Sequence, residues 1–103
     1  MDWKSKENRR LVEAVLALKT DDEARRFLRD LLTENEIEEF AKRLQAAEML
    51  TQNVPYAIIE EKTGLSSTTV ARVSKWLKGK EGGYKTIINR LHHTSAQIGR
   101  GLS

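Results

Sequence analysis

Residues 54–77 read VPYAIIEEKTGLSSTTVARVSKWL and contain the clearest structural pattern in the chain. Pro55 is tolerated in the first turn of a helix, so a helix can begin directly after it. Gly64 can adopt the left-handed conformation that a tight turn between two helices requires. The stretch therefore predicts a helix-turn-helix over about residues 54–78.

The first helix of this pair is expected over about Tyr56–Thr63, and the second over about Thr68–Leu77. Ser66 or Ser67 can cap the second helix through its hydroxyl oxygen. The side chains expected to face the core are apolar and helically spaced; they are Ile58, Ile59, Val70, Val73 and Leu77.

The outward face of the second helix carries short hydroxyl side chains and cations, and no acid. Short side chains let a helix approach the major groove closely, hydroxyls can bond phosphates or base edges, and arginine can bond guanine with two hydrogen bonds. A solvated face of a helical hairpin would normally mix Glu with Lys, so the pattern favours DNA binding. The expected DNA contacts are Tyr56, Ser67, Thr68, Thr69, Arg72, Lys75 and Lys78.

The charge of the chain is unevenly distributed. The net charge is +3, but residues 64–103 carry seven basic side chains and only one acid, Glu81. Residues 33–63 are acidic, with three basic and seven acidic side chains. A basic segment is typical of a polyanion partner, most simply double-stranded DNA, although a solvated basic surface has the same composition.

The rest of the chain is also predicted to be helical, which gives an all-α fold with about six helices. Pro55 is the only proline, and apolar residues recur at helical spacing. Two capping boxes, Thr20–Glu23 and Thr33–Glu36, mark the starts of helices. The helices expected outside the helix-turn-helix cover about residues 4–19, 21–32, 34–50 and 84–93.

The length of 103 residues is enough for one domain, expected over residues 1–93. The segment 94–103, TSAQIGRGLS, is polar and small, and we expect a flexible tail. A chain this short buries only about 60–70% of its unfolded surface. Leu11, Val15 and Leu18 form an apolar side that a monomer would cover poorly, so a homodimer is expected.

Several other classes of protein are not expected. Cysteine is absent, and the N-terminus has no apolar core that would make a secretory signal, which favours a cytoplasmic location. No apolar stretch reaches the roughly 20 residues of a membrane-spanning helix. His92 and His93 are adjacent and so point in different directions, which does not suit a metal pair. We expect no enzyme activity, no metal site and no cofactor.

The stretch from Leu31 to Leu91 resembles the Trp repressor family, and in particular its Trp-repressor-like subgroup of small bacterial proteins. The matching residues and short motifs are Leu32-Thr33-x-x-Glu36, Arg43, Glu48, Leu50, Thr63-Gly64, Thr69-Val70-x-Arg72 and Ser74-x-x-Leu77-Lys78. The resemblance implies an intertwined all-α homodimer whose N-terminal helices wrap around the partner. It also implies a transcriptional regulator, and more specifically a repressor.

The resemblance also identifies the positions of a ligand pocket. Arg43 and Arg72 are at positions similar to those of the two arginines that hold tryptophan in the Trp repressor. Val73 and Trp76 replace a smaller glycine and serine, so we expect a filled pocket that does not bind free tryptophan. Trp76 can pack in the core or take the place of the ligand, with Arg72 four residues earlier on the same helix face.

Two alternatives to a ligand-independent regulator remain open. One is a regulator gated by another, unidentified small molecule. The other is a protein-interaction adaptor that uses the helix-turn-helix to dock a partner without DNA.

Overall fold

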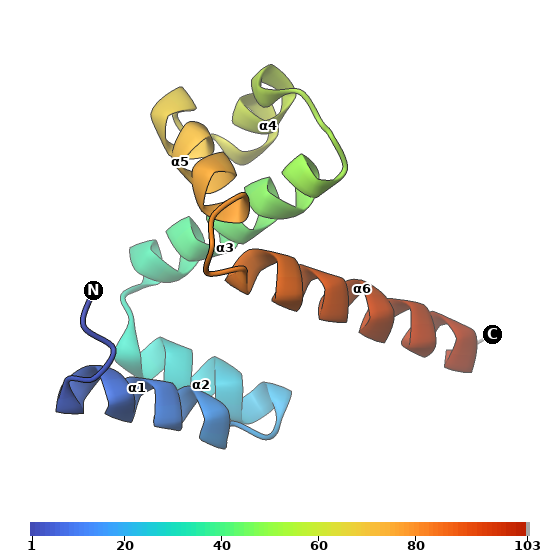
Figure 1. The fold of residues 1–103 in the computed structure, drawn as a ribbon. Coiled ribbons are helices and arrows are strands. Elements are labelled where there is room, and N and C mark those ends of the chain that lie inside the picture. Colours follow the sequence, from blue (N-terminus) through green and yellow to red (C-terminus); the bar gives the residue numbers. More distant parts are fainter. Residues whose placement is uncertain (103) are drawn as a thin grey trace. The chain divides into compact units, whose positions relative to one another are not determined.

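The computed structural model contains six α-helices and, over the residues it describes, no strand (Figure 1). It describes the backbone of residues 1–102 and the side chains of residues 1–93. The helices are α1 (Lys6–Ala17), α2 (Asp21–Leu31), α3 (Glu34–Thr51), α4 (Tyr56–Thr63), α5 (Ser67–Leu77) and α6 (Gly83–Leu102). The prediction of an all-α fold with about six helices is confirmed.

The last helix is longer than predicted. It was expected to end at about His93, but α6 ends at Leu102. Polar composition alone does not end a helix, since the segment contains no proline. The predicted flexibility of residues 94–103 lies outside the residues whose side chains are described, and it stays a prediction.

The chain divides into an N-terminal unit, Met1–Ile37, and a C-terminal unit that begins at Glu38. In the N-terminal unit, neither α1 nor α2 has a buried residue. Several large apolar side chains of this unit are well exposed; they are Trp3, Leu11, Val12, Val15, Leu16, Leu28 and Leu31. The N-terminal unit therefore has no closed core of its own.

The capping box Thr33–Glu36 forms as predicted, and the box Thr20–Glu23 forms only in part. The Glu36 amide donates to the Thr33 hydroxyl at 3.1 Å, and the Thr33 amide donates to the Glu36 carboxylate at 2.9 Å. The bond from the Thr33 amide lowers the pKa of Glu36, so this contact stabilises the fold above the ordinary glutamate pKa and is lost on acidification. In the other box, the Glu23 amide donates to Thr20, but the Glu23 carboxylate accepts from the amide of Lys19 instead.

The turn between α4 and α5 is built as the sequence predicts. Gly64 adopts the left-handed conformation with φ of 75°, which a side chain would disfavour. Ser66 is the residue that caps α5, and its hydroxyl accepts from the Thr69 amide at 3.2 Å. The buried Thr63 hydroxyl donates to the Ile59 carbonyl at 2.7 Å and accepts from the Leu65 amide at 3.2 Å. These bonds hold the turn between α4 and α5 in place.

The core of the C-terminal unit joins α3, α4, α5 and α6. Val70, Val73 and Leu77 are buried on α5, as predicted. The residues of the buried cluster are Ala46, Ala47, Ile59, Leu65, Val70, Val73 and Ile88.

One inward residue of α4 was predicted wrongly. Ile59 is fully buried, but Ile58 is 39% exposed. Consecutive residues of a helix point about 100° apart, and α4 meets this core on the side of Ile59. On α6, Ile88 is buried while Ile87 and Leu91 are exposed.

Candidate nucleic-acid interface

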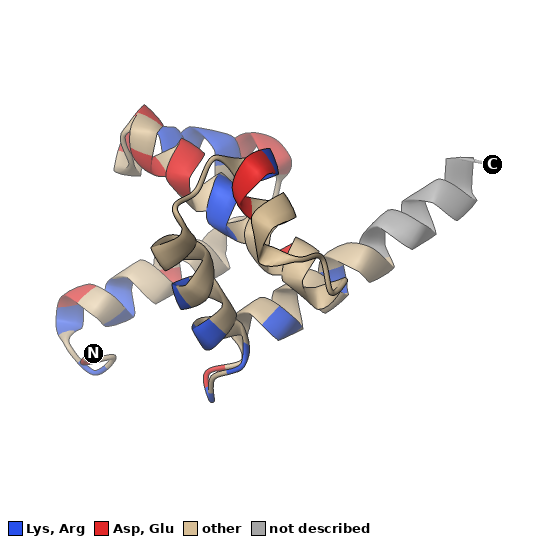
Figure 2. Ribbon diagram, turned by 90° about the horizontal axis from the view of Figure 1, so that it is seen from above, with Lys and Arg blue, Asp and Glu red and all other residues tan. Residues whose placement is uncertain are grey.

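The outward face of α5 is accessible and contains no acid. Ser67, Thr68, Arg72 and Lys75 are exposed, and Lys78 is exposed directly after the helix. Figure 2 shows Lys and Arg, without acidic residues, along α5 and along the coloured part of α6. The face therefore presents positive charge and hydroxyls on a rigid helix.

Thr69 differs from its neighbours because its hydroxyl takes part in the cap. The Ser66 hydroxyl donates to the Thr69 hydroxyl oxygen at 3.0 Å, and Thr69 is only partly exposed. The Thr69 hydroxyl still has its own proton to donate. It can therefore bond an acceptor on a base or a phosphate while the cap holds it in place.

The first turn of α5 contains no acidic side chain. The amino end of a helix carries partial positive charge and unpaired amides, both of which favour a phosphate. Tyr56, 43% exposed, begins α4, the other helix of the pair. All seven predicted DNA contacts thus lie on α4, on α5 or directly after α5.

The four positions of the predicted ligand pocket have different surroundings. Val73 is fully buried in the core cluster. Arg72 is exposed on α5. The Arg43 guanidinium lies over the Phe40 ring, 5.6 Å from its centroid, and the Arg43 Nε lies 3.6 Å from a carboxylate oxygen of Glu39. That Nε is buried and has no hydrogen-bond partner within the described residues.

Trp76 is 49% exposed and does not belong to the core cluster, so of its two predicted roles core packing is not observed. The other role, in which it takes the place of the ligand, stays a prediction. Within residues 1–93, Arg43 and Phe40 form the one cation–π contact, so Arg72 does not stack on Trp76.

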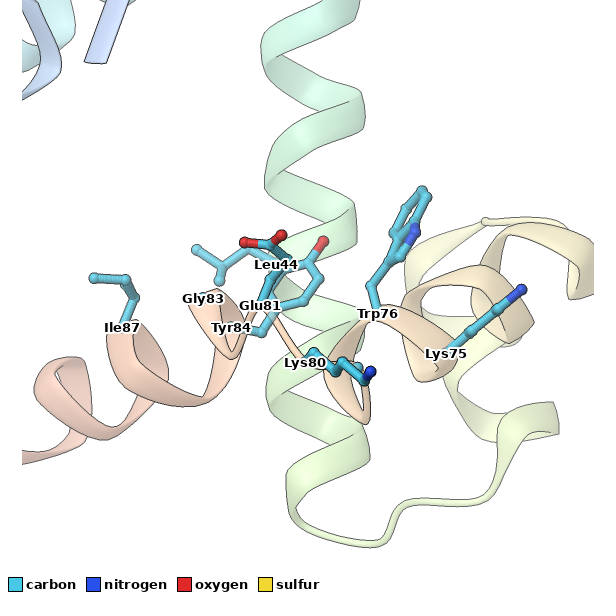
Figure 3. Close-up of a pocket in the computed structure, with 9 residues that line it drawn as sticks. Leu44, Lys75, Trp76, Lys80, Glu81, Gly83, Tyr84 and Ile87 are labelled. Atoms are coloured by element: carbon cyan, nitrogen blue, oxygen red, sulfur yellow. The ribbon is translucent and has the colours of Figure 1, made fainter. Parts of the chain in front are cut away.

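Trp76 instead lines an apolar groove of about 750 Å³, which we call the Trp76 groove. Figure 3 shows the indole at one end and Ile87 at the other, with Leu44 and Tyr84 between them. Partial burial raises the pKa of the Tyr84 hydroxyl, and the Arg43 charge opposes this shift. The remaining lining residues are Lys75, Gly79, Lys80, Glu81 and Gly83.

Sequence reasoning did not anticipate the Trp76 groove. Its walls come from α3, α5 and α6, and Leu44 is 43 positions before Ile87. Trp76 and Ile87 are large apolar side chains on helices, and helical spacing does not indicate that they are exposed at a groove. Of the two cations at the same groove, Lys75 was predicted as a DNA contact, and Lys80 was seen only as part of the basic segment.

The described residues were also compared with the requirements of a membrane-spanning helix and of a metal site. No helix there is long and apolar enough to cross a membrane. No group of three or more His, Cys, Asp or Glu side chains is arranged to hold a metal ion among them.

The chain is similar to known proteins over most of its length. The sequence profile of the Trp repressor protein family matches residues 6–92. The Bacillus subtilis protein YerC, which is uncharacterized, is 36% identical over 94 residues, covering 91% of this chain and 90% of YerC.

Two solved structures share the fold. The structure of a TrpR-like protein from Eubacterium eligens has a TM-score of 0.80 and 38% identity, covering 87% of this chain and 93% of that one. A structure from Staphylococcus aureus has a TM-score of 0.81 and 34% identity, covering 89% and 95%. With the fold shared at TM-scores of 0.80 and 0.81 and a profile match over residues 6–92, the chain belongs to the Trp repressor family of DNA-binding transcription regulators.

Proposed function

We propose that this protein is a sequence-specific transcriptional repressor that binds double-stranded DNA as a homodimer and needs no tryptophan. The main support for the proposal is the exposed face of α5, which contains hydroxyl and cationic side chains and no acidic side chain. In this proposal α5 enters the major groove, with Thr68, Thr69 and Arg72 toward the bases. Tyr56, Ser67, Lys75 and Lys78 hold the phosphates on either side.

A homodimer supplies the missing cover for the apolar side chains of the N-terminal unit. Val12, Val15 and Leu16 lie on one face of α1 and are 42%, 53% and 78% exposed. Burying such a side chain yields about 1.5–3 kcal/mol, which favours association. In the dimer, residues 1–93 would act as one domain, and two copies of α5 would reach successive major grooves about 34 Å apart.

A salt titration of operator binding tests the DNA-binding proposal. Each copy presents two predicted cationic contacts to phosphates, Lys75 and Lys78, so a dimer would neutralise about four phosphates. The logarithm of the affinity should then fall with the logarithm of salt concentration with a slope of about −4.

The operator for this titration is selected from genomic fragments with the purified protein, and binding is followed by fluorescence anisotropy. A slope near zero, or no selected operator, would favour the protein-interaction adaptor. Placing the operator across a promoter should lower reporter expression; increased expression would contradict the repressor assignment.

L-Tryptophan should change neither stability nor operator affinity. Val73 is fully buried and fills the position where the Trp repressor has a glycine. A ligand raises the unfolding midpoint only if it binds the folded state. Thermal unfolding with and without millimolar tryptophan should therefore give the same midpoint. A higher midpoint with tryptophan would contradict the filled pocket.

A double variant, Val73→Gly with Trp76→Ser, checks the reason for this independence. It should unfold at a lower temperature because the core loses packing at Val73. If it also loses operator affinity and regains it with tryptophan, the two large side chains take the place of a ligand. Unchanged affinity would show that Trp76 has no such role.

A regulator gated by another small molecule is the second candidate function, and the Trp76 groove favours it. The groove is open, mainly apolar, and begins at the end of α5. A compound bound there could shift the position of α5 only if it binds the protein more tightly in one position of α5 than in another. A metabolite that raises the unfolding midpoint of the wild type, but not of Trp76→Ala, would support this candidate.

A further inference from the structure

A second hollow lies between the end of α3 and the middle of α6. Its volume is about 310 Å³, and it shares no lining residue with the Trp76 groove. Its lining residues are Thr51, Gln52, Lys85, Ile88, Asn89 and His92. We call it the α3–α6 hollow.

The polar groups of the hollow are mostly hydrogen-bond donors. Lys85, Asn89 and His92 are spaced i, i+4 and i+7, which places them on one face of α6. Ile88, only 4% exposed, anchors this part of α6 in the core. An ammonium group, an imidazole and two side-chain amides can all donate, and no carboxylate lines the hollow.

Cations near the carboxyl end of a helix often serve to satisfy its last carbonyl groups. Here three of the last four carbonyl groups of α3 are satisfied without them. The Thr51 hydroxyl donates to the Glu48 carbonyl at 2.6 Å, and the Gln52 amide donates to the Met49 carbonyl at 3.1 Å. The Asn53 amide donates to the next carbonyl, that of Leu50, at 3.0 Å. Capping of α3 therefore does not explain the donors on α6.

Lys85 and His92 also have no acidic partner in the part of the chain with described side chains. The five ion pairs found there involve other residues, and neither side chain makes a hydrogen bond to the described residues. Lys85 and His92, both exposed, thus line a hollow that has no negative charge in its lining.

We propose that the α3–α6 hollow binds a phosphate group. A phosphate oxyanion accepts several hydrogen bonds at once and suits converging ammonium, imidazole and amide donors. The hollow is large enough for one such group. The phosphate can belong to the DNA backbone, which rests on the proposed function, or to a free phosphate ion. From Gln52 the chain runs directly to Tyr56 at the start of α4, so the site borders the segment that enters the helix-turn-helix.

The first arm of the test uses inorganic phosphate and the full chain. Nuclear magnetic resonance should show the His92 ring signals shifting as phosphate replaces chloride at constant ionic strength. His93 is the internal control: the neighbouring ring lies outside the hollow, and its signals should move much less.

Three variants give the contrast. Lys85→Gln and His92→Gln should each weaken phosphate binding by about tenfold or more, since each removes a donor to a charged acceptor. Arg90→Gln should bind phosphate as the wild type does, because Arg90 is exposed on another face of α6. Unfolding midpoints confirm that the variants fold; equal shifts of His92 and His93, or no loss in the variants, would overturn the proposal.

The second arm uses the selected operator and separates the two sources. If the phosphate is part of the DNA backbone, Lys85→Gln removes one contact from each copy of the dimer and should reduce the salt slope by about 2, whereas Arg90→Gln should not. If Lys85→Gln leaves the slope unchanged but still weakens phosphate binding, the ligand is a free phosphate ion. If no operator is found while phosphate still shifts His92, the proposed function fails and the phosphate site stands.

Discussion

Replacing Arg72 with alanine should weaken binding to the selected operator by about 1–3 kcal/mol, the usual value of a bidentate contact to a base. Arg72 is exposed on α5 and makes neither an ion pair nor a cation–π contact with the described residues. Its loss should therefore act on the DNA contact and leave folding unchanged. The measurement is fluorescence anisotropy at fixed salt, together with the unfolding midpoint.

Adding Thr69→Ala to Arg72→Ala should weaken binding further and relax the sequence preference. Part of that loss is expected to be structural, because the Thr69 hydroxyl accepts a bond from the capping Ser66. Arg90→Ala on α6 is the matched control, since it removes the same charge from an exposed position outside the reading helix. A double variant that binds the operator as well as the wild type would refute the assignment of α5 to recognition.

Replacing Val15 and Leu16 with glutamine should convert the dimer to a monomer and lower operator affinity by about 100-fold or more. Both side chains are more than half exposed in the single chain, so their loss should harm association more than the fold of one copy. Affinity falls because two linked reading heads bind far more tightly than one. Light scattering at micromolar concentration measures the change in mass.

Glu13→Gln on the same helix is the control for this pair of substitutions. It introduces the same amide but removes only an exposed ion pair with Arg10, which contributes little to stability. The control should remain a dimer with full affinity. A wild-type monomer, or a glutamine variant that stays dimeric, would contradict the proposed role of α1 in association.

The local elements of this protein are readable from the sequence. Gly64 adopts the left-handed conformation, Ser66 caps α5, and Thr33 and Glu36 bond each other as a capping box. Each of these features depends on residues within about four positions of one another. The bounds predicted for α4, Tyr56–Thr63, are the ones observed, because Pro55 and Gly64 delimit the helix at both ends.

Which apolar side chain faces the core was harder to predict. Ile58 and Ile59 are identical side chains next to each other, and only packing against α3 and α5 determines which one is buried. For Trp76, the sequence offered core packing or a ligand-like role. The tertiary structure leaves the indole half exposed at a groove rather than in the core, and the ligand-like role stays a prediction.

The sequence by itself determined the helices, the helix-turn-helix and the acid-free face of α5, because capping, glycine turns and helical spacing are local effects. Only the tertiary structure produced the Trp76 groove and the α3–α6 hollow. Each brings together residues more than thirty positions apart, such as Gln52 and Lys85. The direction in which two helices cross depends on how the whole core packs, and no short stretch of sequence specifies it.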